Sequence, residues 1–466
     1  MKMTLKELCG ATGGHILKGS PEITACHITT ASNVIKGDDL FIPIKGERTD
    51  GHKYIGSAFA NGAAVSLTEY ENTDGVPEGK GLILCKDNVK ALQDIAGYCR
   101  KKYIKIPCVG ITGSVGKTTT REVTSKALSG GLRVYTTKGN ANSQIGLPVT
   151  VAETDPDAQI AVYELGISEF GEMEIISDIA SVDTACITNI GVSHIAQFGT
   201  QQNILREKLN IIKNLPDGGF LFVNGDDPIL KELTEERIHD MGLMTGKRVN
   251  IRTFGLSETC DVYAADIEKK DGCFSFTAVF NDNGENVRVS LSVPGEHMIG
   301  NALCALSVCR LYNVPLEKAA ECLNSYKNFE GRGNIIERAG VRFINDCYNA
   351  SPVSMKAGLK VLSDMDTKGR RIAVLADMKE LGENEKEYHK EIGRFIKDNV
   401  PDLSVLFTFG ELSEHISEEA AYPGIPVIRH FTDIEELKKE LFATLTEGDL
   451  CFIKGSNSMG LSRILN

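Results

Sequence analysis

The hydrophobic positions of this chain form short continuous runs that end at a glycine or an acidic residue and are followed by segments of helical periodicity. In the middle of the chain these runs occupy residues 106–113, 133–139, 159–166, 184–191 and 219–227. Apolar runs of this length are typical of strands buried on both faces, and helices between them favour a parallel sheet. The pattern predicts a central α/β domain over residues 105–327.

The two ends of the chain differ from the middle and from each other. Residues 1–104 mix short apolar runs with turn-forming residues and carry no nucleotide motif, which predicts a small α/β domain. Residues 328–466 alternate regularly between strand and helix, which predicts a doubly wound, Rossmann-like domain. The strands are expected at 341–346, 371–378, 403–410, 425–431 and 449–455, and the helices at 352–365, 384–399 and 433–445. The fold class is therefore α/β with three domains.

Composition narrows the class of protein. The chain has 466 residues, and its net charge of −12 has the wrong sign for binding nucleic-acid phosphates. Its 13 cysteines are an odd number, are scattered and form no C-x-x-C pair, so we expect reduced thiols, no zinc site and a cytoplasmic location. Neither a signal-peptide core nor an apolar stretch of about 18 residues occurs, which predicts that the chain does not enter a membrane.

The strongest chemical signal is a glycine-rich turn between the strand at 106–113 and a helix expected to begin near Thr118. It reads Gly113, Ser114, Val115, Gly116, Lys117, Thr118 and Thr119. Glycines let backbone N–H groups approach phosphate oxygens, Lys117 reaches terminal phosphates, and the Thr118 hydroxyl can bind Mg²⁺. The usual spacing would place a glycine at 111, where this chain has isoleucine. The strand–turn–helix context nevertheless predicts a P-loop that binds ATP.

The ends of the neighbouring strands should complete such a site, because parallel sheets bind ligands outside the carboxyl ends of their strands. Glu164 ends one strand and offers hard oxygen ligands for Mg²⁺, and His194 follows another. Asn224, Asp226 and Asp227 follow a third strand, where an Asx turn and a nucleotide contact are equally compatible with the sequence.

Several segments, in this order, resemble the Mur ligases, which are ATP-dependent, amide-forming enzymes of peptidoglycan synthesis. Two of them, at 346–359 and 375–383, are most similar to the branch that adds D-alanyl-D-alanine to a UDP-muramoyl-tripeptide. The resemblance spans all three predicted domains and is carried by TGSVGKTTT, GNANSQIGLP, ELGISEFGE, TNIGVSHIAQFGT, REKLN, VNGDDP, PGEHMIGNALCA, DCYNASP, LADMKELGE and KGSNSMG.

The resemblance implies a role for individual residues. Lys117, His194 and Lys208 would be catalytic, and Thr118, Glu164, His194 and Lys208 would face two Mg²⁺ ions. The local sequence around Lys208 is typical of an exposed lysine on a helix. The resemblance instead implies carbamylation, because the matching lysine of the family is carbamylated. Further ATP contacts are implied at Asn301, Arg332, Asp346 and Asn349, and substrate contacts at Ser32, Lys45, Asn140, Asn142 and Lys454.

The chemistry behind this resemblance can be reasoned independently. A carboxylate must be activated before an amine can displace an oxygen from it, and γ-phosphoryl transfer from ATP provides an acyl phosphate. The resemblance implies small-molecule partners, a UDP-muramoyl-peptide and a D-Ala-D-Ala dipeptide. We expect no nucleic acid partner and no membrane span, and a monomer is the default expectation.

Departures from the family pattern leave two alternatives open. The usual Asp-Ser-Arg of the N-terminal domain reads Ala31, Ser32 and Asn33 here, and Asn457 replaces an arginine. The chain could couple a different carboxylate and amine, or it could be a non-catalytic paralogue that binds a nucleotide sugar. The intact Lys117, Thr118, Glu164, His194 and Lys208 argue against the second alternative.

Overall fold

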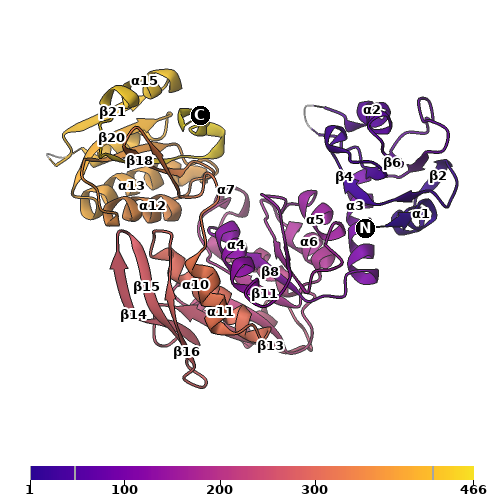
Figure 1. The fold of residues 1–466 in the computed structure, drawn as a ribbon, viewed down its shortest axis with the longest axis horizontal. Helices are drawn as coiled ribbons and strands as arrows, with labels where there is room; N and C mark the ends of the chain where they lie inside the picture. Colours follow the sequence, from indigo (N-terminus) through magenta and orange to yellow (C-terminus); the bar gives the residue numbers. More distant parts are fainter. Residues whose placement is uncertain (1, 47–48, 422–423, 466) are drawn as a thin grey trace.

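The computed structural model describes residues 2–46, 49–421 and 424–465. The described residues form three large β-sheets that follow one another along the chain, together with a two-stranded sheet of β1 and β3 in the N-terminal unit. Figure 1 shows the N-terminal unit in indigo, the central unit in magenta to pink, and the C-terminal unit in orange to yellow. Within the described ranges, no helix is long and apolar enough to cross a membrane.

The N-terminal unit is a mixed five-stranded sheet flanked by helices. Its strand order is β2-β7-β6-β5-β4, with only β2 antiparallel to its neighbour. A capping box between Thr4 and Glu7 starts the first helix. The small α/β unit expected for this part of the chain is confirmed. Its strands and helices are β1 (Met3–Thr4), α1 (Leu5–Thr12), β2 (His15–Lys18), β3 (Thr24–Ala25), β4 (His27–Thr29), η1 (Ser32–Val34), β5 (Asp39–Phe41), η2 (Gly51–Tyr54), α2 (Ile55–Ala60), β6 (Val65–Thr68), β7 (Gly81–Leu84) and α3 (Asn88–Lys102).

The central unit contains a nine-stranded sheet in the order β16-β15-β14-β13-β12-β11-β8-β10-β9. The strands from β9 to β14 in this order are parallel, and β15 and β16 extend the sheet as an antiparallel hairpin pair. The five predicted strands are confirmed as β8 (Cys108–Thr112), β9 (Val134–Thr136), β10 (Ile160–Glu164), β11 (Thr184–Ile187) and β12 (Gly219–Asn224). Four further strands were not predicted from the sequence, namely β13 (Val249–Gly255), β14 (Val262–Lys270), β15 (Cys273–Phe280) and β16 (Asn286–Ser290).

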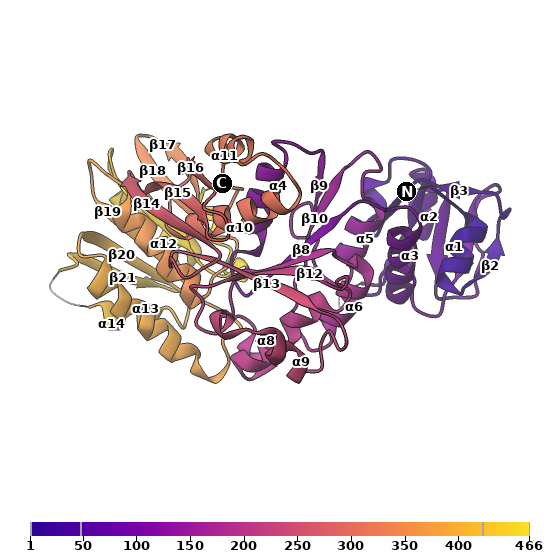
Figure 2. The same cartoon turned by 90° about the horizontal axis from the view of Figure 1, so that it is seen from below.

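Helices cover both faces of the parallel part of this sheet, as the buried strands require. One face packs against α4 (Lys117–Leu128), α10 (His297–Leu311) and α11 (Leu316–Asn324). The other face packs against α5 (Gly146–Ala152), α6 (Glu172–Ala180) and α8 (Gln201–Leu209), where the N-terminal helix α3 also contacts α5 and α6 (Figure 2). Shorter helical segments are α7 (Ile195–Phe198), η3 (Asn210–Ile212), η4 (Leu230–Glu232) and α9 (Glu235–Asp240).

The C-terminal unit is a six-stranded sheet in the order β17-β18-β22-β19-β20-β21, parallel except for β17. All five strands and three helices expected here are present. Three further elements were not predicted from the sequence, namely β17 (Asn334–Arg338), α14 (Glu414–Ala420) and α16 (Ser462–Leu465). The remaining elements are β18 (Val341–Asp346), α12 (Pro352–Asp364), β19 (Arg371–Ala376), η5 (Gly382–Asn384), α13 (Glu385–Asn399), β20 (Leu403–Phe409), β21 (Val427–Phe431), α15 (Ile434–Thr444), β22 (Leu450–Lys454) and η6 (Asn457–Met459).

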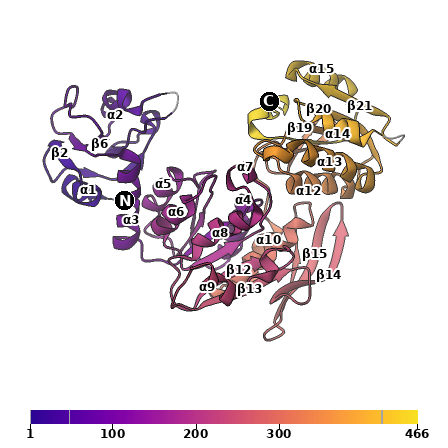
Figure 3. The ribbon, with the colours of Figure 1, turned by 180° about the vertical axis from the view of Figure 1, so that it is seen from behind.

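Contacts on opposite sides of their junction join the C-terminal unit to the central unit. Lys269, near the tip of the β14–β15 hairpin, lies 2.7 Å from the Asp364 carboxylate at the end of α12, and the Asp271 carboxylate accepts the backbone N–H of Asp366 at 2.9 Å. On the opposite side of the junction, α7 contacts η5 (Figure 3). The space between these two contacts contains the main cavity described below.

Candidate active site

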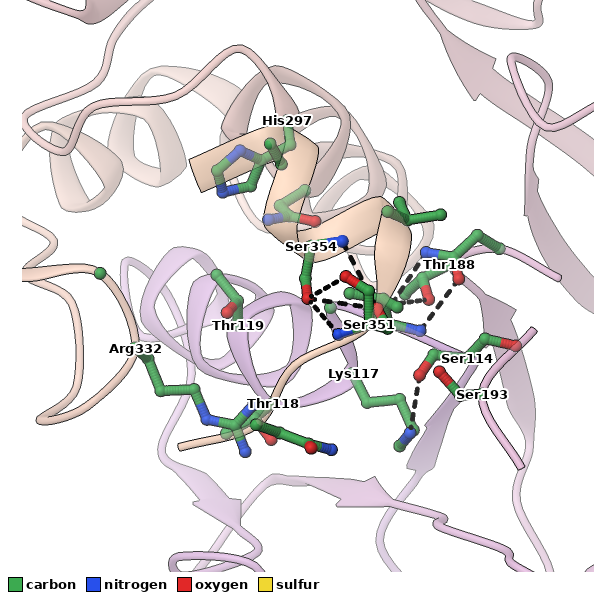
Figure 4. Close-up of a pocket in the computed structure, with 18 of the residues that line it drawn as sticks. Ser114, Lys117, Thr118, Thr119, Thr188, Ser193, His297, Arg332, Ser351 and Ser354 are labelled. Carbon is green, nitrogen blue, oxygen red and sulfur yellow. Dashed lines mark hydrogen bonds between the residues drawn. The ribbon is translucent and has the colours of Figure 1, made fainter. Parts of the chain in front are cut away.

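The glycine-rich turn forms a loop that is fixed by the end of the neighbouring strand. The backbone N–H of Ser114 donates to the Asn189 carbonyl at 3.0 Å, and that of Val115 donates to the Asn189 side chain at 2.9 Å. The Thr188 hydroxyl donates to the Val115 carbonyl at 2.6 Å. Helix α4 begins directly after this loop, at Lys117, one residue before the predicted start. The P-loop arrangement expected from the sequence is therefore present (Figure 4).

Two glycines are needed for this loop to close. Gly113 has φ +151° and Gly116 has φ +83°, both in the region that side chains disfavour. At Gly113 a Cβ atom would lie 1.9 Å from the Thr188 hydroxyl oxygen, so no larger residue fits. The glycines thus allow the loop backbone to turn back over the end of β8.

Lys117 points into the loop that precedes it. Its Nζ donates to the Gly113 carbonyl at 2.9 Å and lies 3.5 Å from the Ser114 carbonyl. Burial lowers the pKa of Lys117, with the Glu164 carboxylate acting in the opposite direction and the Arg332 charge adding to the lowering. Among the described residues the ammonium group bonds only backbone carbonyls, which leaves it available to an anionic ligand.

Glu164 lies under the loop at the carboxyl end of β10 and is 1% exposed. Its Oε1 accepts hydrogen bonds from the Thr118 hydroxyl at 3.1 Å and from the Asn142 amide at 2.6 Å. Its Oε2 accepts from the Arg121 guanidinium at 3.2 Å. The structure thus brings together Thr118 and Glu164, two of the predicted metal ligands, with the predicted substrate residue Asn142.

His194 and Lys208 approach the loop from the other side. Lys208 is 2% exposed and does not line the main cavity, so the expectation of an exposed helix lysine from its local sequence is wrong. Burial, together with the charge of Lys117, holds the pKa of Lys208 well below its ordinary value, and Glu207 offsets this only in part. His194 has φ +61°, and its Nδ1 lies 2.6 Å from the Glu380 carboxylate of the C-terminal unit. Burial is the main cause of its lowered pKa.

Residues after α11 supply the remaining wall of the site. The Arg332 guanidinium stacks on the Tyr348 ring at 3.8 Å. Lys454 is 2% exposed; it pairs with Asp346 and donates to the Asn349 carbonyl at 2.8 Å. From the central unit, Asn301 accepts a hydrogen bond from the Thr120 hydroxyl at 2.9 Å.

These groups surround one cavity of about 730 Å³ between the central and C-terminal units. Its volume is in the range of small-molecule and cofactor sites. Most of the predicted site residues line it, namely Ser114, Val115, Gly116, Lys117, Thr118, Thr119, Asn140, Asn142, Glu164, His194, Asn301, Arg332, Asp346, Asn349 and Lys454. Gly113 forms the loop behind this wall.

Ser32 and Lys45 do not reach this cavity. Both belong to the N-terminal unit, where the Ser32 carbonyl accepts the Asn61 amide at 2.7 Å and Lys45 forms an isolated bridge with Asp50. Beside them, Asp50 lies 2.6 Å from His52 and accepts the Tyr70 hydroxyl at 2.8 Å. Glu47, two residues after Lys45, lies outside the described residues.

Some residues of the site were not singled out from the sequence. His297 and Tyr348 line the cavity, although both lie inside segments that carry the resemblance, so their position in those segments was an available signal. For the segment after β12, the Asx-turn alternative is present, whereas a nucleotide contact stays a prediction. Asn224 accepts the backbone N–H of Asp226 at 3.0 Å, as in an Asx turn, and both residues also line the cavity.

Comparisons with known proteins agree along the whole chain. Three family models match: the Mur ligase family catalytic domain at residues 25–104, the Mur ligase middle domain at 111–309, and the Mur ligase glutamate ligase domain at 331–457. A curated relative from Bacillus subtilis (strain 168), UDP-N-acetylmuramoyl-tripeptide–D-alanyl-D-alanine ligase, is 33% identical over 469 residues, covering 100% of this chain and 98% of the relative.

Solved structures give the same result. A crystal structure of MurF from Acinetobacter baumannii superposes with a TM-score of 0.87 at 28% identity, covering 100% of this chain and 98% of that one. MurF ligase from Thermotoga maritima in complex with ADP superposes with a TM-score of 0.79 at 28% identity, covering 94% and 96% of the two chains. The arrangement of three sheets is therefore shared along nearly the full length of these proteins.

Proposed function

The chain belongs to the Mur ligase family of ATP-dependent, ADP-forming ligases, and we propose that it joins D-alanyl-D-alanine to UDP-N-acetylmuramoyl-tripeptide in peptidoglycan precursor synthesis. The observation that carries this proposal is the single cavity in which the P-loop meets residues of the C-terminal unit. An enzyme that phosphorylates a carboxylate and then exposes it to an amine needs both substrates and ATP at one enclosed place.

The P-loop and Lys117 would bind the β- and γ-phosphates. The N–H groups at the start of α4 and the Lys117 ammonium supply positive charge, and Arg332 faces the same cavity from the other side. The carboxylate and the γ-phosphate are both anions, so these cations would lower the repulsion as the two groups approach. Asn301, Asp346 and Asn349 would contact the rest of the nucleotide.

The residues next to the P-loop fit Mg²⁺. Thr118 and Glu164 present hydroxyl and carboxylate oxygens 3.1 Å apart in a buried setting, and hard oxygen donors are what this ion prefers. When bound, Mg²⁺ would neutralise phosphate charge. We propose that Thr118 and Glu164 hold one ion, and that Glu164, His194 and Lys208 face a second.

We also propose that Lys208 is carbamylated. The described residues include no carboxylate within ion-pair distance of this buried lysine, and its lowered pKa favours the neutral amine. A neutral amine adds to CO₂ and releases one proton, which gives an anionic carbamate. This change would replace an unpaired buried cation, which is costly, with an anionic oxygen donor of the kind that Mg²⁺ prefers.

The reaction would then run in two displacements. A carboxylate oxygen of the muramoyl-tripeptide attacks the γ-phosphorus and the bond to the β-phosphate oxygen breaks, which yields an acyl phosphate and ADP. The free amine of the dipeptide attacks the acyl carbon, and the tetrahedral intermediate expels phosphate after the amine loses a proton. Lys117 and Arg332 would orient the transferred phosphoryl group throughout.

The three parts of the chain would divide this work. We propose that domain 1–104 binds the UDP-sugar substrate through residues that include Ser32 and Lys45, that domain 105–327 binds ATP and metal, and that domain 328–466 closes over the site. Asn140, Asn142 and Lys454 would contact the peptide substrates inside the cavity. Closure would protect the acyl phosphate from water. We further propose that the protein works as a monomer in the cytoplasm.

The direct test is ATP-dependent phosphate release from purified protein supplied with UDP-muramoyl-tripeptide and D-alanyl-D-alanine. Turnover that requires both substrates is expected, and omission of either one is the control. The residues Ala31 and Asn33 distinguish this chain from the usual family pattern, so the same assay should include other amines. Turnover only with a different amine would contradict the proposed pair, and ADP binding without any turnover would contradict an enzymatic role.

A further inference from the structure

Arg121 is a fully buried arginine just behind the P-loop. It lies on α4, four residues after Lys117, and is 0% exposed. Its NH1 donates to the Gly139 carbonyl at 2.9 Å and to the Glu164 carboxylate at 3.2 Å, and its NH2 pairs with Glu122. It does not line the cavity, so it cannot touch a ligand there.

The partners of Arg121 come from separate parts of the chain that meet at the site. Glu164 ends β10, and Gly139 begins the segment after β9 that carries Asn140 and Asn142 into the cavity. Asn142 itself donates to the other oxygen of Glu164 at 2.6 Å. A single guanidinium therefore connects the P-loop helix, the carboxylate at the end of β10 and the base of the 139–142 segment.

An arginine suits this place better than a lysine. A guanidinium offers five donors in a planar fork and remains charged when buried, so it can bond several acceptors in fixed directions at once. The Glu164 carboxylate is bound by Arg121 through Oε2 and by Thr118 and Asn142 through Oε1. The bond to Oε2 fixes the rotation of the carboxylate and so determines where Oε1 points.

We propose that Arg121 is a positioning residue that orients Glu164 and the 139–142 segment relative to the P-loop. This inference rests on the proposed function, because it assigns Glu164 to metal binding. Groups that orient a metal ligand from behind typically change metal affinity or activity by roughly 10- to 100-fold when removed. Arg121 would affect the reaction only through Glu164 and the 139–142 segment.

The test compares Arg121→Gln and Arg121→Lys with a matched control, Lys126→Gln, which removes a positive charge from the same helix. Lys126 does not line the cavity. For each variant, thermal unfolding, ADP affinity with and without Mg²⁺, and the kcat, KM and Mg²⁺ half-activation concentration are measured. The ADP measurements need no turnover, so they remain decisive even if the proposed peptide substrates are wrong.

We expect Arg121→Gln to lower kcat and to raise the Mg²⁺ half-activation concentration, each by roughly 10- to 100-fold. ADP affinity without Mg²⁺ should stay within about twofold of the wild type, whereas the strengthening of ADP binding by Mg²⁺ should be lost. Arg121→Lys should recover part of the loss, because it restores the charge without the fork. Lys126→Gln should match the wild type.

The proposal is overturned if a folded Arg121→Gln protein keeps the Mg²⁺ response of the wild type. It is equally overturned if activity falls while the dependence on Mg²⁺ is unchanged, since a purely structural role would produce that result. If Arg121→Gln fails to fold, Arg121→Lys decides the question: a folded lysine variant with the wild-type Mg²⁺ response contradicts a positioning role.

Discussion

Gly113 is the position of the P-loop where a side chain would be accommodated least, and Gly113→Ala is therefore a severe test of the loop geometry. A Cβ atom at this residue would lie 1.9 Å from the Thr188 hydroxyl oxygen and 3.1 Å from the Thr188 Cβ. Thr188 cannot rotate away freely, because its hydroxyl donates to the Val115 carbonyl at 2.6 Å and the residue is 6% exposed.

The size of the effect follows from three contributions. Holding alanine at φ +151° costs about 1–3 kcal/mol, and forcing an additional carbon into a packed site costs about 1–3 kcal/mol. Loss of the hydrogen bond from Thr188 to Val115 adds about 1 kcal/mol. If the loop avoids this cost by moving, it leaves the arrangement that binds phosphate. The lower ends of the three contributions together amount to about 3 kcal/mol, and a binding free energy weaker by that amount corresponds to roughly a 100-fold loss of nucleotide affinity.

The assay is calorimetric titration of Mg²⁺-ADP into the wild type, Gly113→Ala and Gly242→Ala. Gly242 also has a positive φ, +78°, but no heavy atom lies within 4 Å of its added Cβ, so it controls for backbone strain alone. The double variant Gly113→Ala/Thr188→Ala should regain part of the affinity, because it removes the closest contact. ADP affinity in Gly113→Ala within about threefold of the wild type would refute the steric reasoning, as would a double variant no better than Gly113→Ala.

Three further outcomes are expected. Lys117→Met should reduce phosphate release by roughly 10²–10³-fold, because it removes a charge directed at the transferred phosphoryl group. Thermal unfolding should show no loss of stability, since among the described residues Nζ bonds only backbone carbonyls. Retained turnover would contradict the phosphate role of Lys117. Removal of CO₂ and bicarbonate should lower activity reversibly. A carbamate signal in the ¹³C NMR spectrum of the wild type should be absent from Lys208→Ala. Activity that does not depend on bicarbonate would contradict carbamylation. The Lys102 ammonium, with the backbone N–H of Thr4, lowers the pKa of Glu7 from 4.5 to about 2, so the stability that Glu7 contributes is present above pH 4.5 and is lost as the pH falls toward 2. The difference in melting temperature between the wild type and Glu7→Gln should therefore shrink over that interval, and a constant difference would contradict the assignment.

The amino-acid pattern alone predicts the parallel strands β8 to β12 of the central sheet and the P-loop. Strands such as β8 and β10 are buried along their whole length, so most of their residues are apolar and a polar residue appears only at the carboxyl end, which makes each run visible without structure. The P-loop is recognisable because its glycines and Lys117 are required by local geometry. The antiparallel strand β15 escaped detection because its residues alternate between buried and partly exposed positions, which leaves no continuous apolar run.

Which polar residues share the site depends on how the helices and sheets pack. Lys208 reads as an ordinary surface lysine in its helix, yet it is 2% exposed because α8 packs against the central sheet. Arg121 carries no local signal at all, since its partners Gly139 and Glu164 lie 18 and 43 residues away. Ser32 and Lys45 match substrate positions in the sequence, but they lie in a separate unit outside the main cavity. The burial of a side chain and its distance from residues of other segments arise from the packing of the sheets and helices. Local sequence therefore determines the strands, the helices and the P-loop, whereas packing determines which residues form the active site.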